Sequence, residues 1–200
     1  MQEPRRAEAE SLRIAIISGS ARSPRNGPAV ANWVATELGT RTDARLDLVD
    51  AGEVSFPTYA ELAPGARRDE DALAIRIAAA DGYVVVTPEY NHGYPASLKQ
   101  LLDSYYREWM FKPAMLVSYG VSGGVLAAEQ LRPVFAELHV ATTRKVVAVA
   151  SPWERITNDV FTPSAAERDA LAVAWNELRW WATALRLHRD REPFHSGGRP

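Results

Sequence analysis

Five short runs of β-branched and aromatic residues alternate with five segments of helical periodicity along this chain. The runs that predict strands are 12–17, 45–49, 83–86, 113–119 and 143–149. The helical segments follow at 28–38, 69–80, 95–106, 125–139 and 165–187, the fourth with Pro133 inside it, where we expect a kink or a restart. Such alternation is typical of a parallel sheet covered by helices on both faces. With five strands, the sequence predicts an α/β fold, a flavodoxin-like three-layer sandwich whose five-stranded parallel sheet has the order 2-1-3-4-5.

The length suits one domain of this kind. Of the 200 residues, 12–187 cover all the predicted strands and helices. The charged segment 1–11 precedes them as an extension that we expect to be disordered, and 188–200 as a flexible tail. A loop is expected over 56–65. The chain is therefore predicted to be a single domain with two short appendages.

The last predicted helix has the clearest start signal. Ser164 followed three residues later by Glu167 is a capping box. Its apolar stripe is expected to consist of Leu171, Trp175, Leu178, Trp181 and Leu185. Trp180 lies off that stripe, so it could cover a neighbouring element or face another subunit.

Composition excludes several classes of function. Because the chain has no cysteine, it has no disulfide, thiol nucleophile or thiolate metal site, and no metal site is predicted. The net charge of −2 with scattered basic residues gives no electrostatic footprint for nucleic acid. No apolar run approaches the length that crosses a membrane, and we expect no export signal in 1–11. We therefore expect a cytoplasmic protein without nucleic-acid or membrane partners.

The two most polar turns follow the first and third predicted strands, at 18–27 and 87–94. In the strand order 2-1-3-4-5 the connection reverses direction between strands one and three, and ligands bind in the crevice at that point. The two turns are therefore predicted to flank one ligand site.

The turn after the first strand resembles a phosphate site, because it precedes a helix N-terminus. Gly19 and Gly27 allow close approach of the backbone, Ser20 offers a hydroxyl, and Arg22 and Arg25 bring positive charge. The turn lacks the Gly-Lys-Ser/Thr of a Walker A motif and the Gly-x-Gly-x-x-Gly dinucleotide fingerprint. A phosphate monoester therefore fits better than ATP or a Rossmann-bound NAD, and a solvated basic loop is the alternative.

The next two turns suit a planar ring with polar edges. Pro88, Glu89, Tyr90 and Asn91 offer backbone groups and an aromatic ring after the third strand. The glycine-rich turn 120–124 after the fourth strand is thin enough for a ring to lie against its backbone. Phosphate at one turn and a ring at two others describe a mononucleotide, and flavin mononucleotide (FMN) fits.

Taken together, these motifs resemble the NADPH-dependent FMN reductase family. The resemblance covers about residues 12–150 and rests on Gly19-Ser20-x-Arg22, Pro88-Glu89-Tyr90-Asn91, Pro95-x-x-Leu98-Lys99 and the turn 120–124. It implies a flavodoxin-like fold, bound FMN, NADPH or NADH as co-substrate, a small-molecule electron acceptor, and a homodimer or homotetramer.

The resemblance also implies roles for individual residues. Ser20 and Arg22 would bind the FMN phosphate, the turn 88–91 would line the ring, and Gly120, Ser122 and Gly123 would lie at its pyrimidine side. Many family members have serine and asparagine where this chain has Arg25 and Gly27, with Asn26 between them. Which of Arg25, Asn26 and Gly27 contacts the phosphate therefore stays open.

The expected function is an FMN-dependent NAD(P)H oxidoreductase whose acceptor is a free flavin, a quinone, an azo compound or a metal oxyanion. Because the cofactor carries the chemistry, no catalytic side chain is assigned. A flavin-binding redox sensor or carrier with little turnover is the alternative.

A serine hydrolase is a more distant alternative. Gly120-Val-Ser122-Gly-Gly124 fits the nucleophile elbow Gly-x-Ser-x-Gly. His188 or His195 would then be the base, with Asp159 or Asp169 as its partner.

Overall fold

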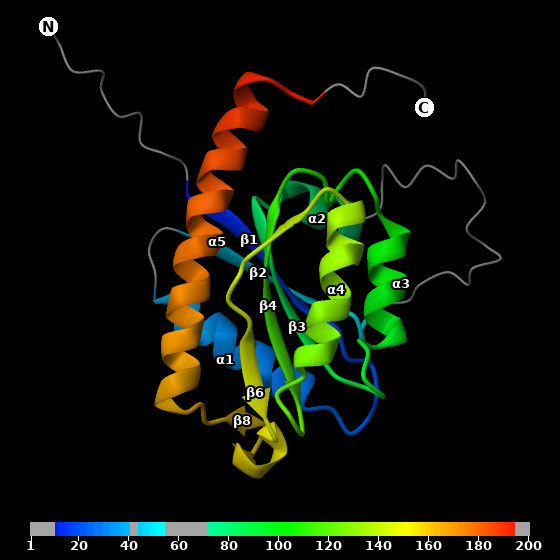
Figure 1. Cartoon of the computed structure of the whole chain (residues 1–200), viewed down its shortest axis with the longest axis vertical. Coiled ribbons are helices and arrows are strands. Elements are labelled where there is room, and N and C mark those ends of the chain that lie inside the picture. Colours follow the sequence, from blue (N-terminus) through cyan, green and yellow to red (C-terminus); the bar gives the residue numbers. More distant parts are fainter. Residues whose placement is uncertain (1–10, 41–43, 55–71, 195–200) are drawn as a thin grey trace, which may run out of the picture.

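The computed structural model describes residues 11–40, 44–54 and 72–194 (Figure 1). The strands of the main sheet are β1 Leu12–Ser18, β2 Ala44–Asp50, β3 Gly82–Pro88, β4 Pro113–Gly120, β5 Ala141–Thr142 and β6 Val147–Ala150. All neighbours pair in parallel in the order β2-β1-β3-β4-β5, and β6 also pairs with β4. The predicted flavodoxin-like strand order is confirmed.

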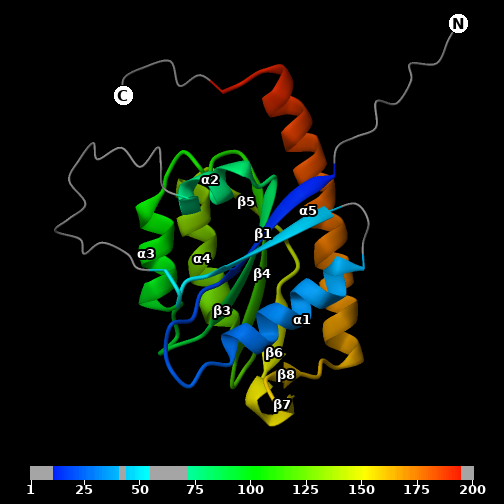
Figure 2. The same cartoon turned by 180° about the vertical axis from the view of Figure 1, so that it is seen from behind.

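Helices cover both faces of the sheet (Figures 1 and 2). They are α1 Gly27–Gly39, α2 Ala72–Ala79, α3 Ala96–Ser104, α4 Val125–Glu137 and α5 Ala165–Arg191. One core cluster joins α1 and α5 to the sheet, and a second joins α2, α3 and α4 to its other face. Every residue of β3 is buried, because this strand lies between β1 and β4 and under helices on both faces.

The expectation of one strand over 143–149 was wrong, because within it only 147–149 form a strand, as part of β6, and the short strand β5 lies before it. Between β5 and β6, side chains take up the backbone groups that a strand would pair. The Arg132 guanidinium donates to the carbonyls of Thr143 (2.9 Å) and Arg144 (3.1 Å). The Arg144 N–H donates to the carboxylate of Glu177 at 3.0 Å. β4 therefore pairs with β5 and with β6, and between them the Thr143 N–H donates to the Ala114 carbonyl of β4 at 2.9 Å.

Two other helices differ from expectation. Of the kink or restart expected at Pro133, the restart does not occur, because α4 continues through Pro133 to Glu137. α5 reaches Arg191, so the helix includes the first four residues of the expected tail, 188–200. The expected loop over 56–65, residues 69–71 of the second predicted helix, and segments 1–10 and 195–200 lie outside the described residues.

α5 is fixed at both ends. At its start the predicted capping box is confirmed, because Glu167 N–H donates to the Ser164 hydroxyl (3.3 Å) and Ser164 N–H to the Glu167 carboxylate (2.6 Å). At its other end, Arg186 forms an ion pair with Asp81 (3.2 Å), and Arg189 donates to the Phe111 carbonyl (2.6 Å). The last turns of α5 therefore lie beside the amino ends of β3 and β4.

The apolar stripe of α5 is shorter than predicted. Leu171, Trp175 and Leu178 are buried as expected, and Ala174 and Ala182 join them. Trp181 is 36% exposed and lies outside the core, contrary to the expectation. None of the described helices is apolar over a stretch that would cross a membrane.

Candidate functional site

The loops that leave the carboxyl ends of β1, β3, β4 and β6 meet at one edge of the sheet and enclose a pocket of about 310 Å³. This edge is where open α/β sheets bind ligands. The pocket is lined by Arg22, Pro24, Asn26, Pro88, Glu89, Tyr90, Asn91, Tyr119, Gly120, Val121 and Trp153. Its size lies at the lower end of small-molecule sites.

The turns after β1 and β3 are joined directly, as the strand order predicted. The Ser20 hydroxyl lies 3.0 Å from the Tyr90 hydroxyl, and Ser20 is 1% exposed. The Arg22 guanidinium lies over the Tyr90 ring, 4.6 Å from its centroid, which is cation–π geometry. A hydroxyl, a cation and an aromatic face therefore come together from two loops.

Gly19 holds the first of these loops close to the sheet. Its N–H donates to the Val86 carbonyl (2.8 Å), and its carbonyl accepts from the Ser97 hydroxyl (2.6 Å). A Cβ at this position would lie 3.1 Å from the side chain of Leu98. Gly19 therefore serves the close passage of the loop over α3 and is not among the residues that line the pocket.

Arg25, Asn26 and Gly27, the three residues among which the sequence left the phosphate contact open, have different surroundings in the structure. Arg25 forms an ion pair with Asp50 at the end of β2 and donates to the Ser20 carbonyl at 2.5 Å. Its charge is therefore balanced by a carboxylate, away from the pocket wall. Asn26 lines the pocket, and Gly27 begins α1. Of the three side chains, that of Asn26 is the one available to a ligand.

Two buried hydroxyls, those of Ser18 in β1 and Tyr119 in β4, lie beside the start of α1. A Cβ at Gly27 would lie 2.9 Å from the Tyr119 hydroxyl and 3.1 Å from the Ser18 hydroxyl. Neither hydroxyl makes a hydrogen bond of ordinary geometry within the described ranges, although that of Tyr119 interacts with Ser20. Burial raises the pKa of the Tyr119 phenol, so it keeps its proton and can donate. Hydrogen-bond donors that lie beside a helix N-terminus and are free to bind a ligand are the groups that bind phosphate.

The turn after β3 is a tight hairpin. Tyr90 and Gly93 exchange backbone hydrogen bonds of 2.8 and 3.0 Å. Between them, Asn91 and His92 have φ of 50° and 66°, as a type I′ turn requires. The His92 carbonyl accepts from the Gln130 side chain of α4 at 2.7 Å. This turn presents Asn91 to the pocket wall, whereas His92 is exposed and does not line it.

Glu89 joins this turn to the start of α4. Its carboxylate accepts the N–H groups of Leu126 (3.0 Å) and Ala127 (3.4 Å). A carboxylate at a helix N-terminus is stabilised by the helix dipole. Glu89 therefore lines the pocket, and its charge is used to hold the turn after β3 against the start of α4.

The glycine-rich turn after β4 reaches the pocket only through its first part. Gly120 and Val121 line the wall, and the Gly120 carbonyl accepts from Ser151 N–H at 2.8 Å. Gly123 has φ of 79°, and a Cβ there would lie 2.9 Å from that of Ala148. Ser122 is exposed. Ser122 and Gly123, which were expected beside the ring, are therefore not among the lining residues.

Sequence reasoning missed four residues of the wall: Pro24, Tyr119, Val121 and Trp153. Trp153 lies in the short 3₁₀ helix Pro152–Arg155 after β6 and is 45% exposed. A signal for it existed, because its loop follows the fifth predicted strand at the same edge of the sheet.

Comparison with known proteins identifies the family. The sequence profile of NADPH-dependent FMN reductases matches residues 12–154. The chain belongs to the NADPH-dependent FMN reductase family. It is 37% identical over 161 residues to an NAD(P)H-dependent FMN reductase of Schizosaccharomyces pombe, covering 76% of this chain and 80% of the relative.

One further relative of this FMN reductase family member and one solved structure of similar fold extend the comparison. It is 33% identical over 143 residues to a 2-hydroxy-1,4-benzoquinone reductase of a Burkholderia species, covering 65% of this chain and 73% of that protein. Its fold resembles that of FerB, an NAD(P)H:acceptor oxidoreductase flavoenzyme of Paracoccus denitrificans. The two structures share a TM-score of 0.68 and 21% identity over 86% of this chain and 98% of that one.

Within the described residues of this FMN reductase family member, the hydrolase arrangement with His188 as the base is not assembled. Ser122 follows the carboxyl end of β4, whereas His188 lies in the last turn of α5, beside the amino end of that strand. The eight residues of β4 span about 25 Å. The other candidate base, His195, lies outside the described residues.

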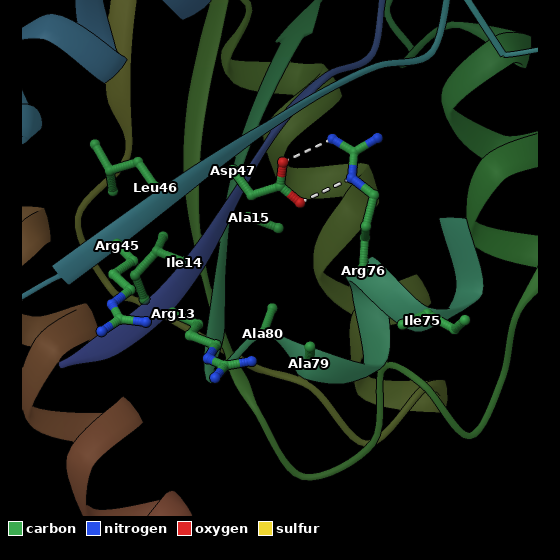
Figure 3. Close-up of a pocket in the computed structure, with 10 residues that line it drawn as sticks. All are labelled: Arg13, Ile14, Ala15, Arg45, Leu46, Asp47, Ile75, Arg76, Ala79 and Ala80. Carbon is green, nitrogen blue, oxygen red and sulfur yellow. Dashed lines mark hydrogen bonds and ion pairs between the residues drawn. The ribbon is translucent and has the colours of Figure 1, made fainter. Parts of the chain in front are cut away.

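A second cavity of about 370 Å³ lies between β1, β2 and α2 (Figure 3). Its charged residues include Arg76, which donates to both oxygens of the Asp47 carboxylate at 2.9 and 2.7 Å. This hydrogen-bonded pair raises the pKa of Arg76. Alanine and other apolar side chains form much of the remaining wall. Arg13 and Arg45 also line it, toward the amino ends of β1 and β2, so the cavity lies away from the carboxyl edge of the sheet, where ligands bind in this fold.

Proposed function

We propose that this member of the FMN reductase family is an FMN-dependent NAD(P)H oxidoreductase. Hydride from NADPH or NADH would pass through bound FMN to a small acceptor, namely a free flavin, a quinone, an azo compound or a metal oxyanion. Family membership supports the proposal. The observation that carries it is the convergence of Ser20, Arg22 and the buried Tyr119 hydroxyl beside the start of α1.

These residues fit the phosphate of FMN. The Arg22 cation, the two hydroxyls and the N–H groups of the helix start are the donors that such a dianion requires. Tyr90, Asn91, Gly120 and Trp153 line the adjoining wall and would hold the flavin ring. The bound flavin supplies the two-electron redox chemistry.

The protein's own part is then binding and orientation. Ser20 and Tyr90 hold each other through their hydroxyls, so phosphate and ring subsites keep one geometry. Trp153, half-exposed at the pocket, offers an aromatic face that would exclude water from one side of a bound ring. No side chain is required as a general acid or base.

The proposal includes a homo-oligomeric state and a cytoplasmic location. The family resemblance supports the first. A cysteine-free chain, which needs no oxidising compartment, fits the second.

The visible spectrum and the steady-state oxidation of NAD(P)H test the proposal. The purified chain should bind FMN more tightly than FAD, and should oxidise NAD(P)H when a quinone or free flavin is added. Flavin binding without turnover on any acceptor would favour a redox sensor or carrier instead. Tighter binding of FAD than of FMN, or no flavin binding, would refute the phosphate assignment.

Replacing Ser122 with alanine should change NAD(P)H oxidation by less than about tenfold. The exposed hydroxyl can contribute at most one ordinary hydrogen bond, roughly 0.5–1.5 kcal/mol. A nucleophile would behave differently, because its loss costs several powers of ten. The measurement is NAD(P)H turnover with ester hydrolysis assayed in parallel, and an esterase activity that disappears in Ser122→Ala would support the hydrolase.

Replacing Tyr119 with phenylalanine should weaken FMN binding about fivefold, since a neutral donor contributes about 1 kcal/mol. Riboflavin, which lacks the phosphate, should bind as before. Thermal stability should change little, because the hydroxyl makes no hydrogen bond of ordinary geometry with the described residues. Isothermal titration of both ligands into apoprotein checks this, and an unchanged FMN affinity would remove Tyr119 from the phosphate site.

A further inference from the structure

A third cavity, of about 530 Å³, lies at the amino edge of the sheet, and we call it the amino-edge cavity. Its wall comes from the end of α2, the turn between α3 and β4, and the end of α5 with the residues just after it. In Figure 1, α2 and the last turns of α5 lie toward the same end of the molecule. The cavity shares no lining residue with the pocket at the carboxyl edge, and β4, which runs between the two edges, spans about 25 Å. It is therefore a separate place for a ligand.

The charged residues that line the amino-edge cavity are three cations and one carboxylate, namely Arg107, Lys112, Arg189 and Glu108. Lys112 is 6% exposed. Its ammonium donates to the backbone carbonyls of Ile77 (3.0 Å), Ala78 (2.7 Å) and Glu108 (2.7 Å), all of them uncharged groups. The Glu108 carboxylate accepts the Tyr106 N–H of its own turn at 3.0 Å. Lysine is rarely buried this deeply without an ion pair.

The positive charge at this cavity exceeds what the neighbouring carboxylates balance. Burial, followed by repulsion from Arg189, lowers the pKa of Lys112 to about 7. The carboxylates of Asp81 and Glu108 oppose this shift but do not cancel it. Burial also lowers the pKa of Arg189, because the Asp81 carboxylate is shared between Arg189 (3.5 Å) and Arg186 (3.2 Å). A bound anion would stabilise the charged form of both Lys112 and Arg189.

Two guanidinium groups are able to donate to such an anion. Arg107 is exposed, and its side chain forms no ion pair or hydrogen bond with the described residues. Arg189 donates to the Phe111 carbonyl at 2.6 Å and lies 3.5 Å from the Asp81 carboxylate, which leaves part of its five donors unused. Guanidinium groups bind carboxylates and phosphates through charge-assisted hydrogen bonds.

The side of the cavity next to these cations is aromatic. The rings of Phe111 and Phe194 lie 4.4 Å apart, inclined by 44°, and Phe194 is 59% exposed. Phe111 has φ of 58°, which is uncommon for a bulky side chain. Its N–H donates to the His139 carbonyl at 2.9 Å, and its carbonyl accepts from Arg189, so both of its backbone polar groups are fixed. The fold thus holds an aromatic face beside the arginines in spite of backbone strain.

We infer that the amino-edge cavity binds a small aromatic carboxylate. The carboxylate would accept hydrogen bonds from Arg107 and Arg189, and the ring would pack against Phe111 and Phe194. The volume lies within the range of about 300–1,000 Å³ for small-molecule sites. An inorganic anion would use the cations and leave the aromatic wall uncovered. Because none of these residues lines the pocket at the carboxyl edge, the inference does not rest on the proposed function.

Isothermal titration of 1-naphthoate into the full chain tests the class of ligand. 1-Naphthoate should bind with a dissociation constant of about 1 mM or less. The neutral 1-naphthamide has nearly the same shape and should bind ten- to a hundredfold more weakly, because it cannot form charge-assisted hydrogen bonds. Equal affinities for the two compounds, or no binding of 1-naphthoate, would overturn the proposal. Inorganic phosphate that bound as tightly as 1-naphthoate would overturn the aromatic part of it.

Two variants test the place of binding. Arg107→Gln should weaken 1-naphthoate at least tenfold, and Phe194→Ala about two- to tenfold. Both side chains are exposed, so thermal stability should stay close to that of the parent. Arg45→Gln is the matched control, because Arg45 is an exposed arginine of β2 that lines the cavity of Figure 3 and not this one. Unchanged affinity in both test variants would refute the assignment.

The pocket at the carboxyl edge is the competing place for an aromatic anion. Arg22→Ala should leave the affinity for 1-naphthoate unchanged, whether or not the chain binds FMN, because Arg22 does not line the amino-edge cavity. In the FMN-loaded chain, 1-naphthoate should leave the visible flavin spectrum as it is. Loss of binding in Arg22→Ala, or a shifted flavin spectrum at the same ligand concentration, would place the ligand in the other pocket and overturn the proposal.

The dependence of binding on pH gives a further test. The groups that face the Lys112 ammonium are Asp81, Tyr83, Glu108 and Arg189. Because an anion favours the charged ammonium, affinity for 1-naphthoate should be highest below about pH 7 and should fall as Lys112 loses its proton above it. Titrations in buffers of different ionisation enthalpy should then show proton uptake on binding just above pH 7, and Lys112→Met should abolish it. Binding without proton uptake in the parent chain would contradict an excess of positive charge at the cavity.

Discussion

Replacing Gly124 with alanine is expected to lower the free energy of unfolding by about 3 kcal/mol or more, since a left-handed non-glycine residue and an overpacked site each cost roughly 1–3 kcal/mol. Gly124 has φ of 70°. A Cβ there would lie 2.7 Å from the Tyr119 nitrogen and 2.8 Å from its oxygen. These are backbone atoms of β4, so no change of rotamer can relieve the contact.

Urea unfolding measures this effect, and Gly39→Ala is the matched control. Gly39 ends α1, and a Cβ there would meet nothing within 4 Å. Alanine at that helical position should be neutral or should stabilise the protein by up to about 1 kcal/mol. A Gly124→Ala variant as stable as the parent would show that the turn after β4 can rearrange freely, contrary to the prediction.

The fold could be predicted from the sequence because its signals are local. The apolar run 83–86 lies within β3, whose residues are all buried, and the alternation of strands with helices leaves few topologies. The strand order then brought two polar turns together, and the Ser20–Tyr90 contact confirms that they meet. Fold and the location of the site thus follow from patterns within short segments.

The roles of single residues depended on partners far away in the sequence. Both Arg22 and Arg25 looked like phosphate ligands, but Arg25 pairs with Asp50 at the end of β2. Glu89 looked like part of the ring site, but its carboxylate caps α4, 37 residues further on. Periodicity and motif spacing contain no information about such pairings, because they are set by distances in the folded protein.

Two further departures from expectation have the same cause. The strand expected over 143–149 is interrupted because Arg132 of α4 takes up its carbonyl groups. Gly123 was expected against a flavin ring, yet the absence of a side chain there lets the turn pass Ala148 of β6. A glycine-rich turn indicates that its backbone passes close to another group, but the sequence does not show whether that group is a ligand or another part of the protein.

Replacing Arg22 with alanine is expected to weaken FMN binding by ten- to a hundredfold and to leave riboflavin binding nearly unchanged. A charge-assisted hydrogen bond to phosphate contributes roughly 1.5–3 kcal/mol, which corresponds to about that change in affinity. Arg22 lines the pocket, and its side chain forms no ion pair or hydrogen bond with the described residues. Its guanidinium contacts only the face of Tyr90 there, so its charge is available to a ligand. Equilibrium titration of both flavins into apoprotein at two salt concentrations measures the effect, and added salt should reduce the difference between FMN and riboflavin.

Arg25→Ala is the contrasting variant, because it removes the same charge from the same loop. Arg25 holds the Ser20 carbonyl and the Asp50 carboxylate. Its loss should loosen the loop, lower stability, and weaken FMN and riboflavin by similar factors. If Arg22→Ala also weakened both ligands equally, Arg22 would act by supporting the Tyr90 ring, and the phosphate would have to be bound by Ser20, Tyr119 and the start of α1 without it.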